Sequence, residues 1–234
     1  ADVTDINGET RSGEQTVSVS YKSLMLVTGI PESLEVDSLK KLSIRTENMN
    51  GEFEPANVKV TITKLKAQTR LTRARYWERP DQFVMTKTAY LQNFPYDEYD
   101  NETDYRSWEK ESDEFTKSDS ARKDGAWTIT KDAWTPGYYV VEISTHDKNG
   151  EEVKDVKYIE LFDPNSSTLN RPEFLWRGPK NTVVEPGETA AMQLGTSADS
   201  VYMVQTITRA ADILTTDKKY SIVRVSAEKK TFHF

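Results

Sequence analysis

Cysteine is absent from the 234 residues of this chain, and histidine occurs only twice. Without cysteine the chain cannot form a disulfide framework, a thiolate zinc site or a cysteine nucleophile, and a disulfide-pinned immunoglobulin domain is excluded. The two imidazoles, His146 and His233, lie 87 residues apart, and neither a G-x-S-x-G nor an H-E-x-x-H motif occurs. No glycine-rich loop that could hold a phosphate precedes a helix. We therefore predict no enzyme, no cofactor and no catalytic residue in this chain.

Long apolar runs are also missing. No stretch approaches the roughly 20 apolar residues that span a bilayer, and the polar start at residues 1–4 lacks the features of a signal peptide. The formal net charge is -7, whereas nucleic-acid binding needs a concentrated positive surface. These features predict a segment that is soluble as it stands, binds no nucleic acid and does not insert into a membrane.

An acidic run at residues 97–104 raises the question of a calcium site, because hard oxygen ligands suit that ion. Its spacing lacks the glycine and the distal glutamate that an EF-hand loop requires at fixed positions. We interpret the run as a solvated acidic loop, and we predict no metal site.

Short alternating runs rich in Val, Ile, Thr and Tyr dominate the chain, and clusters of Gly, Pro, Asn and Asp separate them. This pattern is typical of antiparallel β-sandwiches, in which one face of each strand is apolar. Val58, Val60 and Ile62, for example, alternate with polar neighbours. The predicted fold class is therefore all-β. The expected strands cover residues 15–21, 39–46, 58–65, 137–145, 153–162, 189–195, 201–208 and 220–226.

A repeated motif suggests how the chain is divided. Residues 5–9 and 147–151 both read D-x-N-G-E, 142 residues apart, and Asn-Gly supplies the positive φ angles of a tight hairpin turn. If each hairpin closes a module, residues 1–21 are the C-terminal hairpin of a preceding sandwich and residues 22–163 are a complete module. Residues 164–234 then hold a linker and an incomplete following sandwich. The alternative is a chance match in a chain rich in turns.

A long insertion interrupts the middle module. At about residues 66–126, some sixty residues separate the strand that ends near Leu65 from the strand that begins near Trp127, far more than a sandwich turn needs. Residues 64–79 carry six cations and one acid, whereas residues 97–119 carry ten acids and three cations. These two parts can pack against each other or dock separately on partners. Intramolecular pairing is favoured because its effective concentration is higher.

The insertion is rich in aromatic residues, which predicts an ordered and partly helical segment. Thr86 can cap a short helix that runs through Leu91 and ends before Pro95, and residues 107–115 can hold another helical turn. We interpret the aromatic side chains as a small core of the insertion. The alternative is an exposed platform that binds carbohydrate or protein. The candidate interaction residues are Trp77, Tyr96, Tyr99 and Trp108.

Five short motifs follow one another along the chain. They are residues 3–10 (VTDINGET), 50–53 (NGEF), 77–81 (WERPD), 94–99 (FPYDEY) and 137–141 (GYYVV). Their order resembles that of bacterial alpha-2-macroglobulin family proteins of the Bacteroidetes type, and the resemblance covers nearly the whole chain. It implies tandem fibronectin-like macroglobulin β-sandwich (MG) domains of a large exported protein, periplasmic or at the cell surface and often a lipoprotein.

The resemblance also implies a function. Proteins of this family are endopeptidase inhibitors that trap attacking proteases, in some cases through a thioester formed in a C-x-E-Q motif. A chain without cysteine cannot contain that thioester, so within the resemblance this segment is scaffold. Its partners would be the neighbouring domains of the parent chain and, through the full-length protein, the trapped proteases. The alternative is a surface binding or adhesin module that recognises carbohydrate or protein through the aromatic residues of the insertion.

Overall fold

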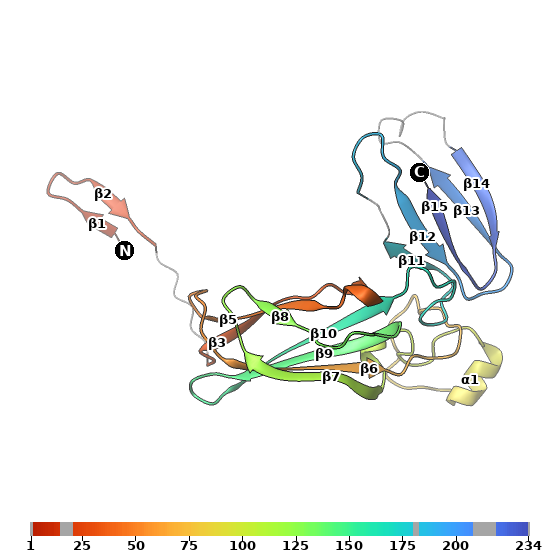
Figure 1. Ribbon diagram of the computed structural model, residues 1–234, viewed down its shortest axis with the longest axis horizontal. Coiled ribbons are helices and arrows are strands. Elements are labelled where there is room, and N and C mark those ends of the chain that lie inside the picture. Colours follow the sequence, from red (N-terminus) through yellow and green to blue (C-terminus); the bar gives the residue numbers. More distant parts are fainter. Residues whose placement is uncertain (1, 15–20, 180–182, 208–218, 234) are drawn as a thin grey trace.

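The computed structural model describes residues 2–14, 21–179, 183–207 and 219–233 (Figure 1). Within these ranges the chain is mostly β-strand, which confirms the predicted all-β class. None of the described helices has the length and apolar character that a bilayer-crossing helix requires. The strand predicted at residues 15–21 lies outside the described residues, apart from Tyr21.

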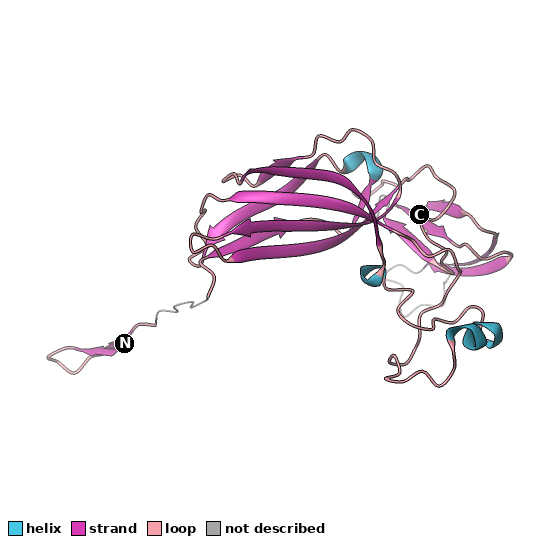
Figure 2. Ribbon diagram, turned by 90° about the horizontal axis from the view of Figure 1, so that it is seen from below, coloured by secondary structure: helices cyan, strands magenta, loops and turns pink. Residues whose placement is uncertain are grey.

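Two facing sheets form a β-sandwich (Figures 1 and 2). Its strands are β3 (Leu24–Gly29), β4 (Ser33–Glu35), β5 (Lys41–Asn48), β6 (Asn57–Leu65), β7 (Lys110–Ser120), β8 (Ala126–Thr128), β9 (Gly137–His146) and β10 (Glu152–Phe162), with the 3-10 helix η1 (Val36–Ser38) after β4. One sheet has the order β4-β10-β9-β6-β7, in which only the β4–β10 pair is parallel. The other sheet has the order β3-β5-β8 and is antiparallel.

The core of the sandwich lies between the two sheets, and the side-chain period of two in the strands creates it. Val58, Val60 and Ile62 of β6 are at most 1% exposed, as their alternation predicts. They share one cluster with Ile44 and Trp127 of the facing sheet. Burial of each such aliphatic side chain stabilises the fold by about 1.5–3 kcal/mol.

Strand β9 is buried on both faces near its start. Tyr139 and Val141 face the sandwich core. Tyr138 and Val140 face outward and form a second cluster with Leu65 of β6. Antiparallel sheets commonly leave one face in water, so this outer apolar patch requires a cover. The cover comes from the insertion between β6 and β7.

The D-x-N-G-E motif forms a hairpin turn, as predicted, but the turn type differs. Between β9 and β10 the Gly150 N–H donates to the Asp147 carbonyl at 3.0 Å, and Gly150 has a φ of 84°. Asp147 Oδ1 also accepts the N–H groups of Asn149 and Glu151, at 2.8 and 2.9 Å. Only the glycine of this turn adopts a positive φ. The loop therefore has three residues with a left-handed glycine. The hairpin is confirmed, but the expectation that Asn149 as well as Gly150 has a positive φ was wrong.

The same turn occurs at two other places. Strands β1 (Asp2–Thr4) and β2 (Thr10–Ser12) pair around one copy, in which Asp5 Oδ1 accepts two backbone N–H groups at 2.9 Å. Residues 48–52 form a third copy, in which Asn48 takes the place of the aspartate. Because this copy lies inside the sandwich, the turn is not confined to the end of a module. The module boundaries drawn from the motif remain predictions.

The insertion is shorter than the sequence predicts. We expected it at about residues 66–126, but β7 re-enters the sheet at Lys110 and pairs with β6, so the insertion covers residues 66–109. Strand β7 is the edge of its sheet, carries charges of both signs and shifts register twice against β6. Charged side chains and irregular register at an edge strand limit its pairing with other chains.

Two short helical segments lie in the insertion. Helix α1 (Lys87–Asn93) confirms the helix predicted after Thr86, whose Oγ1 accepts the Ala89 N–H at 3.3 Å. The 3-10 helix η2 (Tyr105–Ser107) follows. The helical turn predicted at residues 107–115 is wrong beyond η2, because backbone pairing with β6 draws these residues into β7.

A second group of strands, the C-terminal unit, stands over the end of the sandwich where the insertion lies (Figure 1). Its strands are β11 (Trp176–Pro179), β12 (Ala191–Gly195), β13 (Val201–Ile207), β14 (Lys219–Val225) and β15 (Lys229–His233). Strands β11, β12 and β15 form one antiparallel sheet, and β13 pairs with β14. Strands β12, β13 and β14 confirm the three strands predicted in this region.

Asp147 ties the first strand of the sandwich to the β9–β10 hairpin. Its Oδ2 accepts the backbone N–H and the hydroxyl of Ser23, both at 2.9 Å. These bonds from Ser23, with those from the turn, lower the pKa of Asp147 from 3.8 to about 2. A lowered folded-state pKa contributes stability that is present above the ordinary value and is lost as the pH falls through the folded value.

We predict that Asp147→Asn lowers the midpoint of thermal unfolding by several degrees at neutral pH, because an amide cannot accept all four hydrogen bonds as a carboxylate does. The difference from the parent chain should shrink as the pH falls from 3.8 towards about 2. Circular dichroism melts across this range measure it. Asp5→Asn, in a copy of the turn outside the sandwich, should leave the melt unchanged. A pH-independent deficit in Asp147→Asn would contradict the argument.

Candidate functional site

The basic and acidic parts of the insertion pack against each other. Arg73 Nε lies 2.5 Å from Asp97 Oδ1, and Arg79 Nε lies 2.5 Å from Asp100 Oδ1. Arg73 and Asp97 also form an isolated parallel β-bridge. The intramolecular pairing favoured by the sequence is therefore confirmed.

We call residues 66–79 the first limb of the insertion and residues 95–109 the second limb. Arginine side chains of the first limb also bind backbone carbonyl groups of the second limb. Arg75 donates to the carbonyls of Tyr99 and Asp100, at 3.0 and 2.6 Å. Arg70 donates to two further carbonyls, at 2.7 and 3.0 Å. A guanidinium group satisfies several acceptors in one plane, so these arginines fix the separation of the two limbs.

The acidic run is a structural network, which corrects the expectation of a solvated loop. Glu98 is buried, and its Oε1 accepts the N–H and the hydroxyl of Thr103, at 3.0 and 2.5 Å. Glu102 accepts two backbone N–H groups and lies 2.8 Å from Lys87 Nζ. Burial opposes the charge of Glu102, but the bonds from Lys87 and the backbone lower its pKa overall. Among the described residues no group of three or more side chains is arranged to hold a metal ion.

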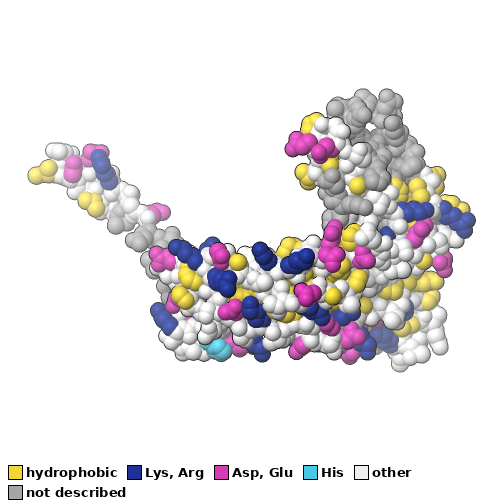
Figure 3. Space-filling view, viewed as in Figure 1, with side chains coloured by type: hydrophobic (Ala, Val, Ile, Leu, Met, Phe, Trp, Pro, Cys, Tyr) yellow, Lys and Arg dark blue, Asp and Glu magenta, His cyan; other side chains and the backbone are white. Residues whose placement is uncertain are grey.

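One of the four candidate aromatic residues, Tyr99, belongs to a small aromatic core in the insertion, and a second, Trp77, lies at its exposed edge. The ring of Tyr99 stacks on Phe83 at 4.4 Å and contacts Tyr90 at 5.3 Å, and its hydroxyl donates to the Met85 carbonyl at 2.7 Å. These rings line an apolar pocket of about 160 Å³ together with Trp77, which is 60% exposed. Figure 3 shows hydrophobic side chains gathered over this part of the molecule.

The other two candidate aromatic residues lie elsewhere. Tyr96 is 53% exposed and contacts Phe174 edge-on at 5.9 Å. Trp108 contacts Tyr138 edge-on at 5.1 Å and covers the outer face of β9. Neither lines the apolar pocket. The four rings therefore do not form one platform.

Arg171 occupies the junction between the sandwich, the insertion and the C-terminal unit. Its Nε donates to Glu173 Oε1 at 2.6 Å, and its Nη1 donates to the Thr103 carbonyl at 2.7 Å. The guanidinium carbon lies 5.3 Å from the ring centre of Tyr138 and 5.8 Å from that of Trp108. One side chain thus contacts β9, two parts of the insertion and the segment that leads to β11.

Two groups of the junction, Arg171 and Tyr138, keep one protonation state over a wide pH range. Burial opposes the charge of Arg171, but the hydrogen bond to Glu173 outweighs this, and the pKa of Arg171 lies above its ordinary value. Burial, with a contribution from Glu160, raises the pKa of the Tyr138 hydroxyl far above its usual range. That hydroxyl donates to Glu173 Oε1 at 3.4 Å. A charged guanidinium and a neutral phenol therefore persist over the whole ordinary pH range.

The segment predicted as a linker is bonded to the C-terminal unit. The Ser197 N–H donates to the Glu173 carbonyl at 2.7 Å, and the Glu173 N–H donates to Ser197 Oγ at 3.2 Å. Gln193 Nε2 of β12 donates to the Pro164 carbonyl at 2.9 Å. The connection between the sandwich and the C-terminal unit is therefore hydrogen-bonded on both sides of Arg171.

Glu160 of β10 is a partly buried carboxylate at the same junction. Asn170 Nδ2 donates to Glu160 Oε1 at 2.7 Å and to the Leu161 carbonyl at 2.8 Å. Burial raises the pKa of Glu160, the bond from Asn170 opposes this, and the nearby charge of Glu173 adds to the rise. The Glu160 carboxylate is thus partly buried and repelled by Glu173 at the point where the sandwich connects to the C-terminal unit.

Sequence reasoning did not identify Arg171 or Glu173 as site residues. They lie in a loop, where no strand or helix period marks a position. The one available signal was that Arg171 is the only cation between Lys157 and Arg177.

No protein-family model matches the chain, and no curated protein matches it. Among solved structures it is similar to a tetra-tandem repeat in the extending region of a large adhesion protein, with a TM-score of 0.32 and 15% identity. That likeness covers 99% of this chain and 46% of the other. The chain therefore spans less than half of that structure, and a likeness at this level assigns no function.

We predict that Trp108→Ala destabilises the sandwich by about 2 kcal/mol, because it uncovers the ring of Tyr138. Trp77→Ala is the matched control, since its side chain is mostly exposed, and it should change stability by less than about 0.5 kcal/mol. Urea unfolding followed by circular dichroism measures both. Equal effects would show that Trp108 does not act as a cover.

We predict that Glu160→Gln raises the midpoint of thermal unfolding by a few degrees at neutral pH, since the amide avoids a buried charge and still accepts the Asn170 bond. A raised folded-state pKa gives stability that is present below the ordinary value and is lost as the pH rises through the folded value. The advantage of the variant should therefore vanish in acid. Glu173→Gln, which weakens the partner of Arg171, should lower the midpoint instead. A lower midpoint for Glu160→Gln at neutral pH contradicts this reading.

Proposed function

We propose that this chain is a non-enzymatic structural segment of a larger all-β protein, and that it sets the angle between successive β-units. The observation that carries the proposal is the Arg171 junction. Interfaces between domains in one chain are by default compatible with relative motion unless they are large and apolar. Here charged hydrogen bonds and aromatic rings from three segments meet at one guanidinium.

The insertion supports this role as a bracket between the two units. It covers the outer face of β9 through Tyr105 and Trp108, and it reaches the start of the C-terminal unit through the contact of Tyr96 with Phe174. Its own two limbs are joined by arginine contacts, so the bracket is stiff. A bracket of this kind holds the angle between the units against bending.

We further propose that the parent is an exported, protease-trapping protein of the alpha-2-macroglobulin type. The ordered motifs from residues 3–10 to residues 137–141 support this. On this proposal the segment lies in the periplasm or at the cell surface, its direct partners are neighbouring domains, and the full-length protein captures proteases. The sequence of the parent gene tests it. A lipoprotein signal upstream and a C-x-E-Q motif downstream are expected, and a parent that ends shortly after Phe234 contradicts the proposal.

A second candidate function is a surface binding module. The observation that favours it is a polar groove of about 660 Å³ in the insertion, and not an exposed row of aromatic rings. The groove and the junction share Trp108, which lines the first and contacts Arg171 in the second.

We predict that Arg171→Ala loosens the angle between the sandwich and the C-terminal unit and costs about 2 kcal/mol, because it removes two charged hydrogen bonds. Distances between spin labels on the exposed residues Lys154 and Arg224 measure the angle; the distribution should broaden. Arg171→Lys should broaden it too, since an ammonium group cannot reproduce a planar fork.

Arg177→Ala, an exposed arginine on β11, is the matched control and should leave the distribution as in the parent chain. Thermal melts confirm that each variant is folded. An unchanged distribution in Arg171→Ala, with the fold intact, would remove the basis of the structural proposal.

A further inference from the structure

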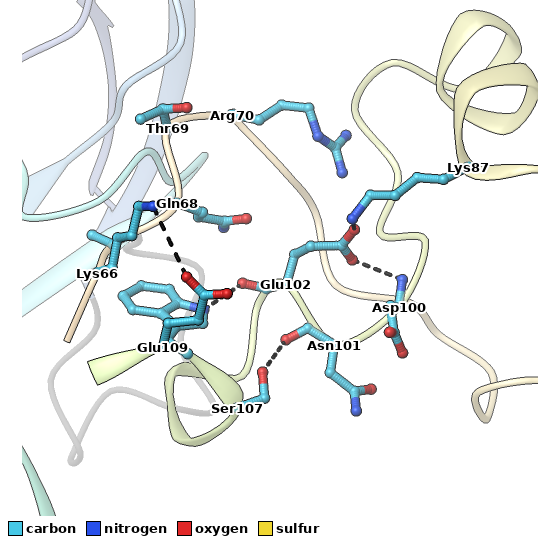
Figure 4. Close-up of a pocket in the computed structure, with 12 residues that line it drawn as sticks. Lys66, Gln68, Thr69, Arg70, Lys87, Asp100, Asn101, Glu102, Ser107 and Glu109 are labelled. Atoms are coloured by element: carbon cyan, nitrogen blue, oxygen red, sulfur yellow. Dashed lines mark hydrogen bonds and ion pairs between the residues drawn. The ribbon is translucent and has the colours of Figure 1, made fainter. Parts of the chain in front are cut away.

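The groove lies between residues 66–70 of the first limb and residues 100–109 of the second limb, with Lys87 of α1 at its side (Figure 4). Its volume of about 660 Å³ falls within the range of small-molecule sites, about 300–1,000 Å³. We infer that this groove binds a neutral saccharide. The inference deepens the second candidate function and does not depend on the structural role of the junction.

The walls of the groove are fixed without a ligand. The Lys66 N–H donates to the Glu109 carbonyl at 2.9 Å and joins the two limbs at one end. Trp108 Nε1 donates to the Glu102 carbonyl at 2.9 Å, and Ser107 Oγ donates to the carbonyl of Asn101 at 2.9 Å (Figure 4). A pre-formed site avoids the entropy cost of ordering loops when a ligand binds.

Three polar side chains that line the groove, those of Gln68, Thr69 and Asn101, make no hydrogen bond to the described part of the chain. Thr69 and Asn101 are exposed, whereas the side-chain oxygen of Gln68 is buried, so we expect Gln68 to act through its N–H groups. An amide offers two donors and one acceptor in a plane, and a hydroxyl both donates and accepts. This set matches the vicinal hydroxyls of a sugar, each of which donates one hydrogen bond and accepts others.

The charges of the groove argue against an ionic ligand. The three cations that line it, Lys66, Arg70 and Lys87, are balanced by three carboxylates. Arg70 and Lys87 are already bonded within the insertion. The cations and carboxylates of the lining cancel in number, so the groove offers no net attraction either to a phosphate or to a cation. A neutral polyhydroxyl compound meets donors and acceptors alike.

Trp108 is the one aromatic residue in the lining of the groove, and because Arg171 lies over one face of its ring, only the other face can meet a ligand. Its indole N–H is held by the Glu102 carbonyl, which fixes the plane of the ring. An aromatic ring offers a flat apolar surface, and the C–H face of a pyranose is the matching surface on a sugar. The polar side chains would then bind the hydroxyl groups at the rim of the same ring.

The experiment is a titration of the full chain, labelled with ¹⁵N, with four neutral disaccharides: maltose, cellobiose, lactose and N,N′-diacetylchitobiose. Inorganic phosphate serves as the charged comparison. At least one disaccharide should shift the side-chain amide signals of Gln68 and Asn101. The double variant Gln68→Ala/Asn101→Ala should weaken that binding by about tenfold or more.

Gln92→Ala is the matched control, since it removes an exposed amide of α1 outside the groove, and it should leave the affinity unchanged. Three outcomes would overturn the inference: none of the four disaccharides shifts these signals, the double variant binds as well as the parent chain, or phosphate shifts the signals at lower concentration. The spin-label distances across the Arg171 junction report on the structural role separately, so failure of one proposal is distinguishable from failure of the other.

Discussion

An apolar patch on the outer face of β9 is the constraint on which the rest of the structure depends. The strand carries Tyr139 and Val141 into the sandwich core and Tyr138 and Val140 out of it, so a two-sheet sandwich alone leaves an aromatic ring in water. The insertion folds back to cover that ring, and Arg171 closes the remaining side. Tyr138 thereby contacts both the insertion and the segment that leads to the C-terminal unit.

Charge has a comparable internal role in the insertion. Many ionised groups would keep a segment solvated if water were their only partner. In the insertion the arginines instead donate to carboxylates and backbone carbonyls, and the carboxylates accept from arginines and backbone N–H groups. The apolar contacts around Tyr99 then need to supply only part of the ordering free energy. Two sets of contacts therefore order the insertion: the ion pairs between its two limbs and the aromatic rings around Tyr99.

The sequence was sufficient for the parts of the fold in which local pattern and burial agree. Strand β6 was predicted because its alternation reflects a real apolar face, and β9 and β10 because they are runs rich in Val, Ile and Tyr. The helix after Thr86 was predicted from its cap. Strand β7 was missed because an edge strand needs few apolar residues and is held by backbone bonds to β6. The junction was missed because the contacts of Arg171 come from segments far apart in the sequence, and no local sequence pattern shows which segments meet. The groove depends in the same way on parts of the two limbs that are thirty or more residues apart.

The charged edge of the sandwich has a consequence for any protein that carries several such units on one chain. Tethered neighbours meet at high local concentration, where open strands of similar sequence tend to exchange partners or to stack into fibrils. Strand β7 presents lysines and acids at short intervals along an irregular backbone, so a second copy that added to it in parallel and in register would bring like charges together. The edge thereby favours separate folding of each unit over misassembly between adjacent ones.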